Sequence, residues 1–93
     1  RVKHYAAKGV RYYPALGVGE FVVEAGEVCV GDDVLVIGPH TGAIETTVKE
    51  LRLEYDPVEK AVKGQHFSIL TGEKIRPGDK LYVWKAVTPT PRP

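Results

Sequence analysis

The sequence predicts a small all-β domain, and three observations carry this prediction. Short runs rich in valine, isoleucine, leucine and tyrosine are separated by glycine and proline at short intervals. Within these runs apolar residues recur at every second position, which is the period of a strand. The only passage that could hold a helical turn, Asp56–Gly64, is too short for a stable helix.

Six strands are expected, each bounded by residues that favour turns. Glycine reaches positive φ, proline presets φ, and aspartate accepts hydrogen bonds from nearby backbone N–H groups. The expected strands cover Gly9–Tyr13, Gly17–Glu24, Asp33–Ile37, Ile44–Tyr55, Gln65–Leu70 and Lys80–Ala86. The expected core consists of Val23, Val28, Val30, Val34, Val36, Val48, Phe67, Ile69, Leu81 and Val83.

The fourth of these strands changes its phase midway. Val48 has the parity of Ile44, whereas Leu51 has the opposite one, so a straight strand would expose half of its apolar side chains. A β-bulge near Lys49-Glu50 would correct the phase and bend the strand. Because bent strands allow a small sheet to close on itself, we expect a closed six-stranded barrel.

The 93 residues suffice for one domain, and the net charge of +1 demands neither nucleic acid nor a membrane as partner. We expect a basic N-terminal segment over residues 1–8, the barrel over residues 9–87, and a disordered proline-rich tail over residues 88–93. The loop at 56–64 is expected to pack Val58 and Ala61 against the barrel rim. A single cysteine and no membrane-length apolar run favour a cytoplasmic location.

The paired carboxylates of Asp32 and Asp33 follow Gly31, and the same order recurs at Gly78-Asp79. Each occurrence comes just before an apolar run. The repetition favours a structural role, in which glycine makes the turn and aspartate binds the N–H groups of that turn. Catalysis by these carboxylates would need an orienting group or a metal ion, and the neighbouring sequence supplies neither.

The passage "VEAGEVCVGDDVLVIGP" resembles the second domain of elongation factor Tu and related translational GTPases. The later passages "EKAVKGQHFSILTG" and "IRPGDKLY" fit the same resemblance, which spans nearly the whole chain. It implies a β-barrel of the translation-protein type. The phosphate-binding pattern of GTPases does not occur, so GTP hydrolysis is not expected. The matching positions are Val23, Glu24, Gly26, Val28, Val30, Gly31, Asp32, Val34 and Gly38.

A closer resemblance is carried by "GVRYYP", "GPHTGAIETTVKEL" and "PVEKAVKGQ". These passages look like the small barrels associated with collagenase-like peptidases of family U-32, where they form an accessory C-terminal domain or a short separate protein. The resemblance implies a recognition module that positions a protein substrate or docks a catalytic domain. The chemistry of that family is assigned to another, larger domain. Some members of the wider family act in RNA modification, so an RNA-binding accessory is the alternative.

No catalytic residue, metal ligand or cofactor site is expected. Cys29 has no histidine near it in the sequence, and a reactive thiol needs an electropositive niche. The three histidines lack the spacing of a metal pair. A peptidase triad containing Ser68 could be assembled only from distant residues, so a self-sufficient peptidase is the least favoured of the three functions.

Two sets of residues are candidates for binding. Tyr82 and Trp84 form an aromatic pair that would dock a protein partner if exposed and belong to the core if buried; His40, in the Gly38–Gly42 loop, is a further candidate. For RNA, the basic N-terminal stretch interleaves cations with aromatic rings, although an edge strand rich in lysine has the same composition. The RNA candidates are Arg1, Lys3, Lys8, Arg11 and Tyr12.

Overall fold

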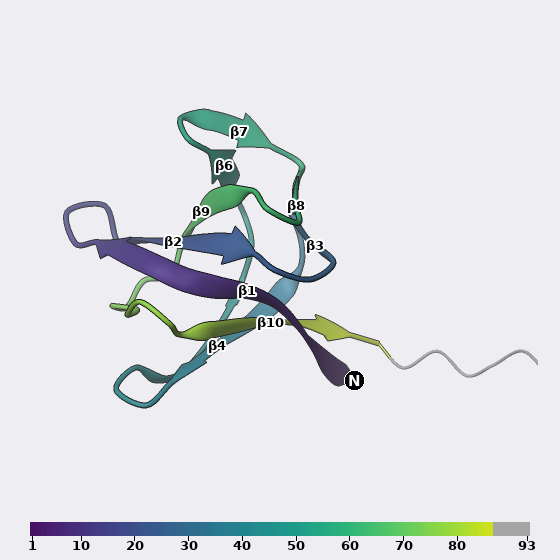
Figure 1. The fold of residues 1–93 in the computed structure, drawn as a ribbon, viewed down its shortest axis with the longest axis horizontal. Helices are drawn as coiled ribbons and strands as arrows, with labels where there is room; N and C mark the ends of the chain where they lie inside the picture. Colours follow the sequence, from purple (N-terminus) through teal and green to yellow (C-terminus); the bar gives the residue numbers. More distant parts are fainter. Residues whose placement is uncertain (87–93) are drawn as a thin grey trace, which may run out of the picture.

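The computed structural model describes residues 1–86, which form ten strands and no helix (Figure 1). The prediction of a small all-β domain is therefore confirmed. The tail predicted over residues 88–93 lies outside the described residues. The strands are β1 (Val2–Tyr13), β2 (Val18–Val23), β3 (Glu27–Cys29), β4 (Asp33–Gly38), β5 (Gly42–Thr47), β6 (Leu51–Leu53), β7 (Asp56–Val58), β8 (Lys60–Val62), β9 (His66–Leu70) and β10 (Lys80–Lys85).

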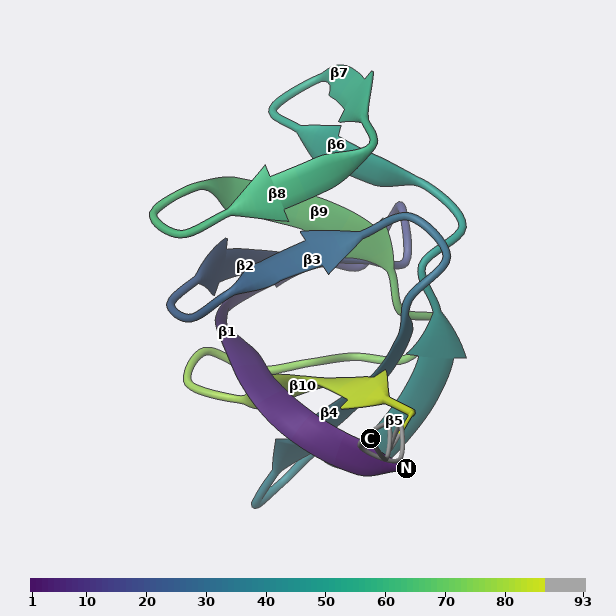
Figure 2. The ribbon, with the colours of Figure 1, turned by 90° about the vertical axis from the view of Figure 1, so that its right-hand side faces the viewer.

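Two antiparallel sheets make up the domain. The larger has the order β5-β4-β10-β1-β2-β9-β6-β7, and the smaller pairs β3 with β8. Figure 2 shows β2, β9, β3 and β8 on one side of the interior and β10, β4 and β5 on the other. Strands β5 and β7 are the two ends of the larger sheet, so the backbone ladders do not join into the closed six-stranded barrel that the sequence led us to expect.

Strand β1 connects the two halves of the molecule. Its first half pairs with β10 as far as Lys8, and its second half pairs with β2 from Ala7 onward. Register shifts between Tyr5 and Ala7, and between Gly9 and Arg11, allow it to bend from one pairing to the other. The basic segment 1–8 therefore forms half of the first strand, which begins seven residues before the predicted start at Gly9.

The predicted change of phase occurs where expected, but the strand breaks there instead of bulging. Strand β5 ends at Thr47 and β6 begins at Leu51, and Val48 and Leu51 are both buried. Directly after β5, the backbone N–H of Val48 donates a hydrogen bond to the Asp32 carbonyl, 2.8 Å away. The break lets the chain leave β4 and join β9, which a bulge within a continuous pairing would not do.

Every predicted core residue is buried except Val30, which is 38% exposed. The prediction for Val30 is wrong because β3 ends at Cys29, so the alternation no longer holds at the following turn. Ala61 is buried and Val58 packs against the core, as expected, but the segment 56–64 forms the strands β7 and β8 instead of the expected loop. The largest core residues beyond the predicted set are Phe21, whose ring stacks on Phe67 at 5.6 Å, together with Leu51 and Ile75.

Both Gly-Asp pairs serve as turns, as predicted. The Asp32 carboxylate accepts a 2.8 Å hydrogen bond from the backbone N–H of Cys29. Asp79 is 2% exposed and accepts from the backbone N–H of Arg76 at 2.9 Å and from the Thr41 hydroxyl. A Cβ atom at Gly38 would lie 1.9 Å from the Asp79 carboxylate, so the buried turn requires glycine at that position.

Candidate functional site

Two outer surfaces of the sheet gather the side chains that could bind a partner. The first, which we name the aromatic face, consists of Tyr5, Tyr82 and Trp84 on β1 and β10. The second is an open cleft on the other half of the molecule, over β2 and β9. The two surfaces differ in geometry and in charge, and each is built from residues that are far apart in the sequence.

The aromatic face lies on the outer side of β10, because Leu81 and Val83 point into the core. Tyr82 and Trp84 are half-buried there. The ring of Tyr5 meets Tyr82 edge-on, with centroids 5.7 Å apart and an interplanar angle of 65°. Sequence alone left open whether the pair is exposed or core. The structure shows that the pair is partly buried: it forms a cluster on the outer surface that neighbouring side chains partly cover.

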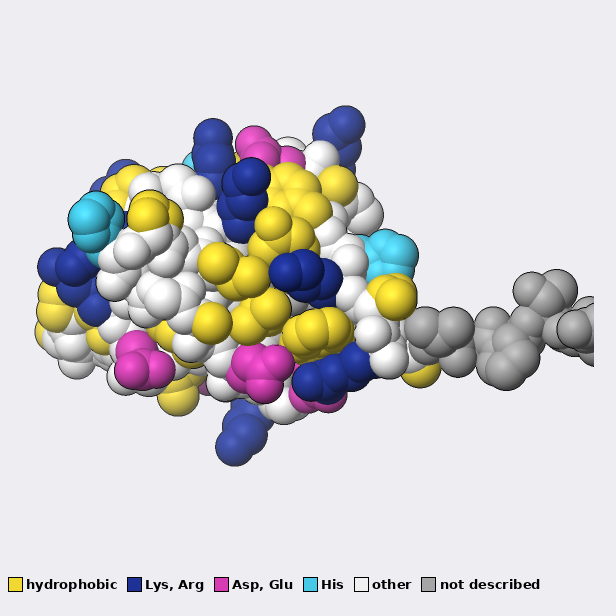
Figure 3. All heavy atoms as spheres, turned by 90° about the horizontal axis from the view of Figure 1, so that it is seen from below, with side chains coloured by type: hydrophobic (Ala, Val, Ile, Leu, Met, Phe, Trp, Pro, Cys, Tyr) yellow, Lys and Arg dark blue, Asp and Glu magenta, His cyan; other side chains and the backbone are white. Residues whose placement is uncertain are grey.

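Two cations cover this cluster. The Arg1 guanidinium lies 4.3 Å from the Trp84 ring centroid, and the Lys3 ammonium lies 4.8 Å from that of Tyr82. Such contacts contribute about 0.5–1 kcal/mol each at exposed sites. The indole Nε1 of Trp84 is buried and has no acceptor within the described chain. Figure 3 views the side where β4 and β10 lie in Figure 1, and shows hydrophobic side chains at its centre among basic and acidic ones.

The hydroxyl of Tyr5 anchors the face to the rest of the molecule. It donates a hydrogen bond to the carboxylate of Glu24, on the far side of β1 from β10. Burial and the adjacent Glu24 carboxylate raise the pKa of Tyr5 to about 12, so this phenol stays protonated at neutral pH. His40, the third predicted docking residue, is exposed in the β4–β5 turn, at the opposite end of β4 from Asp33. The structure therefore does not bring it to the aromatic face.

The predicted RNA-binding residues do not form a free basic surface. Three of the four cations are within ion-pair distance of carboxylates, and the fourth, Lys3, lies over Tyr82. Tyr12 packs against the core instead of presenting its ring for stacking. The pairs are Arg1 with Asp33 at 3.9 Å and Glu45 at 3.6 Å, Lys8 with Glu24 at 3.7 Å, and Arg11 with Glu20 at 3.6 Å.

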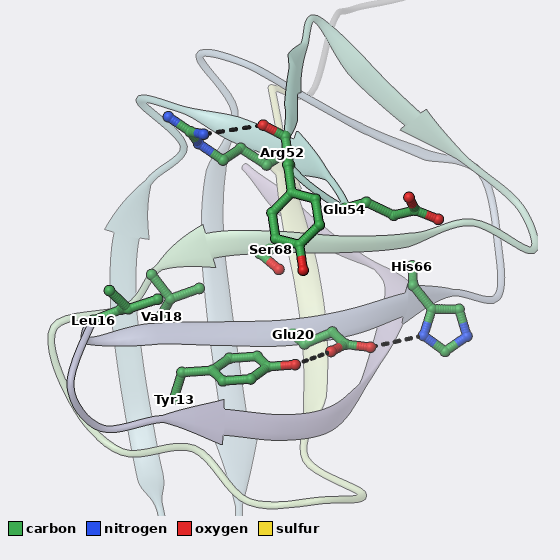
Figure 4. Close-up of a pocket in the computed structure, with 9 residues that line it drawn as sticks. Tyr13, Leu16, Val18, Glu20, Arg52, Glu54, His66 and Ser68 are labelled. Carbon is green, nitrogen blue, oxygen red and sulfur yellow. Dashed lines mark hydrogen bonds and ion pairs between the residues drawn. The ribbon is translucent and has the colours of Figure 1, made fainter.

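The cleft has a volume of about 740 Å³. Strands β2 and β9 form its floor, and the β1–β2 and β6–β7 turns form its two rims (Figure 4). Hydrophobic and charged side chains share its surface, a composition typical of a binding site. The lining residues are Tyr13, Leu16, Val18, Glu20, Arg52, Glu54, Tyr55, His66 and Ser68.

Glu20 is the centre of the polar floor. Its carboxylate accepts a 2.8 Å hydrogen bond from the Tyr13 hydroxyl and lies 3.0 Å from Nδ1 of His66 (Figure 4). Burial of Glu20 opposes ionisation, but the hydrogen bonds from Tyr13 and His66, with the nearby Arg11, outweigh it and hold the pKa below its ordinary value. The Glu20 side chain is therefore a carboxylate over the whole neutral range.

Glu20, His66 and Ser68 are the residue types of a hydrolase triad, yet their arrangement is not that of a triad. Within residues 1–86 no hydrogen bond joins His66 to Ser68, which a nucleophile and its base require. Figure 4 shows His66 beyond Glu20, turned away from Ser68. Cys29 is no better placed, because its hydrogen bond to Glu27 and partial burial raise the pKa of its thiol.

The rim formed by the β6–β7 turn has an unusual backbone. Leu53 pairs with Asp56, which leaves Glu54 and Tyr55 as a two-residue hairpin loop. Glu54 has φ 57°, the only positive value outside glycine in the described chain, and Tyr55 is 88% exposed. The guanidinium of Arg52 donates to the Tyr55 carbonyl at 3.1 Å, which fixes the loop.

Sequence reasoning missed the cleft, since its floor and rims come from three separate segments, 13–20, 52–55 and 66–68. One local signal was present: a tight hairpin usually carries asparagine or glycine, whereas "LEYDP" places glutamate and tyrosine there. Within the part of the chain that is described, no group of acidic, histidine and cysteine side chains is arranged to hold a metal ion. Nor does residue range 1–86 contain a helix of the length and apolarity needed to span a membrane.

No protein family model matches the chain. Among curated proteins, a collagenase of Porphyromonas gingivalis is 51% identical over 82 residues, which are 88% of this chain and 23% of the collagenase. An uncharacterized protease of Methanocaldococcus jannaschii is 32% identical over 76 residues, 82% of this chain and 18% of that protein. The chain is thus homologous to collagenase-type proteins, but it spans less than a quarter of their length.

Solved structures share the fold. The C-terminal domain of a Geobacillus thermoleovorans protein described as a U32 peptidase superposes with a TM-score of 0.79, covering 84% of this chain and 96% of that domain at 15% identity. A second structure of this domain has the same TM-score and covers 87% of the chain and 92% of the domain. These likenesses establish the fold, and the resemblance to U-32 proteins read from the sequence is supported.

Proposed function

We propose that this chain is a non-catalytic accessory module of the U32 peptidase type, which docks a larger catalytic domain and helps to position its protein substrate. One observation carries the proposal: the fold covers 96% of a domain that stands at the C-terminus of a U32 peptidase. The match to only 23% of the Porphyromonas gingivalis collagenase supports it, because most of that relative lies outside the matched segment.

The aromatic face is our candidate for the docking surface. Val2 pairs with Lys85, so the two ends of the described chain lie side by side, and Arg1 rests on Trp84. In a longer protein, any domain that precedes or follows this one would leave from that end of the molecule. Aromatic side chains at the centre of an interface, together with arginine, are the residues that contribute most to binding. An acceptor on the partner would also satisfy the buried Nε1 of Trp84.

A chimera tests this docking role. The matched segment of the Porphyromonas gingivalis collagenase is replaced by this chain, and thermal unfolding is followed by calorimetry. We expect one cooperative transition in the chimera and two separate transitions after Trp84→Ala, because the module no longer holds its neighbour. Tyr55→Ala, on the other side of the molecule, is the matched control and should leave one transition. Two transitions in the unsubstituted chimera, or one that Trp84→Ala does not split, would overturn the proposal.

The non-catalytic part of the proposal is tested on the isolated chain. Because Ser68 lacks a base and the Cys29 thiol is not activated, we expect no cleavage of gelatin, casein or fluorogenic peptides. Cleavage that co-purifies with the chain and disappears in Cys29→Ser or Asp32→Asn would contradict it. We further propose a cytoplasmic site of action, where a lone cysteine stays reduced.

Closure of the larger sheet into a barrel of the elongation factor Tu type also remains a proposal. Backbone hydrogen bonds from Gly31 to Val48 and from Val48 to Asp32, 2.7 and 2.8 Å long, support it by tying the segment after β5 to the segment after β3. Hydrogen exchange is the test. Slow exchange of all β5 amides would support closure, and fast exchange along its outer edge would show an open sheet.

A further inference from the structure

We propose that the cleft binds a proline-rich peptide segment that carries a basic side chain. This goes beyond the docking role, because the cleft lies over β2 and β9, whereas the aromatic face lies on β1 and β10. The proposal rests on three features of the cleft: the position of its floor within the sheet, the apolar side chains of its rims, and the balance of its charges.

The floor cannot bind a peptide by adding a strand. Strand β2 lies between β1 and β9, and β9 lies between β2 and β6, so neither offers a sheet edge to an incoming backbone. The nearest edge is β7, where Pro57 interrupts the row of N–H donors. An occupant must therefore be held through its side chains and rings. Proline-rich segments suit such a floor, because proline has no N–H to satisfy and its extended helix forms without internal hydrogen bonds.

The rims supply the apolar surface that such a segment needs. Leu16 on the β1–β2 turn is 68% exposed, Tyr13 beside it is 37% exposed, and Tyr55 on the opposite turn is 88% exposed. Grooves lined by aromatic rings are the usual receptors for proline-rich segments. Here two tyrosines and a leucine stand on both sides of one groove.

The charges of the cleft call for a basic side chain on the ligand. Glu54, on the rim, has no ion pair to any described residue, whereas the ionised Glu20 on the floor is already bonded to Tyr13 and His66 and lies 3.6 Å from Arg11. The one guanidinium, that of Arg52, is already bonded to Glu50 at 2.6 Å and to the Tyr55 carbonyl. A lysine or arginine of the ligand would therefore find its unpaired carboxylate at Glu54, on the rim.

The backbone of the rim is consistent with a binding role for Glu54 and Tyr55. A two-residue hairpin loop with positive φ favours glycine or asparagine, yet glutamate occupies the position with φ 57°. Conformational strain of this kind is concentrated at ligand-binding sites. The Arg52 hydrogen bond to the Tyr55 carbonyl makes Arg52 a positioning residue for the exposed ring.

Fluorescence anisotropy with a labelled peptide of repeating Pro-Pro-Arg units tests the proposal on the full 93-residue chain. We expect saturable binding that Tyr55→Ala weakens by roughly tenfold or more, since exposed aromatic anchors dominate such contacts. Glu54→Gln should weaken it by a few-fold, and more at low salt than at high salt. Val62→Ala, at an exposed apolar position outside the cleft and the aromatic face, is the control and should leave the affinity unchanged. Far-UV circular dichroism checks that each variant is folded.

Two further peptides decide the ligand class. Replacing every proline by alanine, or every arginine by glutamate, should each abolish binding. The proposal is overturned if the alanine peptide binds equally well, if Tyr55→Ala has no effect, or if no peptide binds. Labelled single-stranded RNA that binds with the same dependence on Tyr55 would also overturn it. None of these results affects the docking proposal, whose test depends on Trp84.

Discussion

The aromatic face and the cleft are both built on the outer side of the same sheet, yet they differ in how far their aromatic rings are covered by other side chains. At the aromatic face the chain covers its own rings. Arg1 and Lys3 lie over Trp84 and Tyr82, and the ring of Tyr5 packs edge-on against Tyr82. At the cleft the rings are left open, and Tyr55 is 88% exposed. The first surface is largely satisfied within the molecule, whereas the second is not.

This difference implies that the two surfaces contribute differently to the free energy of unfolding and to the binding of a partner. Side chains that pack on their neighbours contribute to the free energy of unfolding, and a partner must displace or extend those contacts. Side chains that project from a fixed turn contribute little to folding and are available for a ligand at once. The aromatic face therefore suits a permanent contact with a neighbouring domain, and the cleft suits a peptide that comes and goes.

The largest expected effect tests whether the two surfaces share one core. Phe67 lies on β9 between the cleft residues His66 and Ser68, and its ring stacks on Phe21 inside the molecule. Phe67→Ala should lower the free energy of unfolding by about 3–5 kcal/mol. Denaturant unfolding monitored by far-UV circular dichroism measures it. A loss below about 1 kcal/mol would show that the two halves are stabilised separately.

Trp84→Ala and Tyr55→Ala compare the two surfaces directly. Trp84 is half-buried and covered by Arg1, so its removal should lower the free energy of unfolding by about 2 kcal/mol. Tyr55 is almost fully exposed, and its removal should change the same quantity by no more than about 0.5 kcal/mol. Equal losses in the two variants, measured by the same denaturant titration, would show that the aromatic face and the cleft contribute equally to stability.

Glu54→Gly should sharpen the comparison in the opposite direction. Glycine adopts positive φ without strain, although it also gains freedom in the unfolded chain. We expect the variant to be more stable by up to about 1 kcal/mol and to bind the Pro-Pro-Arg peptide more weakly. Lys63→Gly, at an exposed position of ordinary φ, is the control and should not stabilise the chain. A less stable Glu54→Gly variant would show that the rim is not strained.

The acid limb of the stability curve should report on the floor of the cleft. The pKa of Glu20 is held below its ordinary value in the folded chain, so its ionised form contributes stability above the unfolded pKa. That contribution is lost as the pH falls through the folded pKa. Glu20→Gln should therefore flatten the decline in stability below about pH 5 relative to the parent chain. Thermal unfolding at a series of acidic pH values measures the decline for both proteins. Stability that falls in parallel for the parent chain and for Glu20→Gln would contradict this.

The smallest effect is expected for RNA. At most four N-terminal cations could neutralise phosphates, which limits the slope of log affinity against log salt to about −2.8 for a single strand. Three of these cations are already within ion-pair distance of carboxylates. We predict negligible binding of labelled single-stranded RNA at physiological salt, and loss of any low-salt binding in Lys3→Glu/Lys8→Glu/Arg11→Glu. Tight binding at physiological salt would promote the RNA alternative.

Local features of this protein could be predicted from its sequence, because they depend on neighbouring residues. The two-residue period predicts that Val34 and Val36 point into the core. The Gly-Asp pairs predict the turns at Asp32 and Asp79. The change of parity after Val48 gives the place where the chain changes direction. The aromatic composition of the candidate docking pair, Tyr82 and Trp84, was also visible in the sequence, although its exposure was not.

Only the tertiary structure decided which segments lie side by side. The pairing of Val2 with Lys85 extends β1 almost to the N-terminus and joins the two halves of the larger sheet, and no local pattern specifies it. The cleft arises because β9 pairs with both β2 and β6, which brings Glu20, His66 and Tyr55 to one groove from segments up to 46 residues apart. Alternation fixes the face on which each side chain lies, whereas the order of strands depends on contacts between distant residues, which periodicity does not encode.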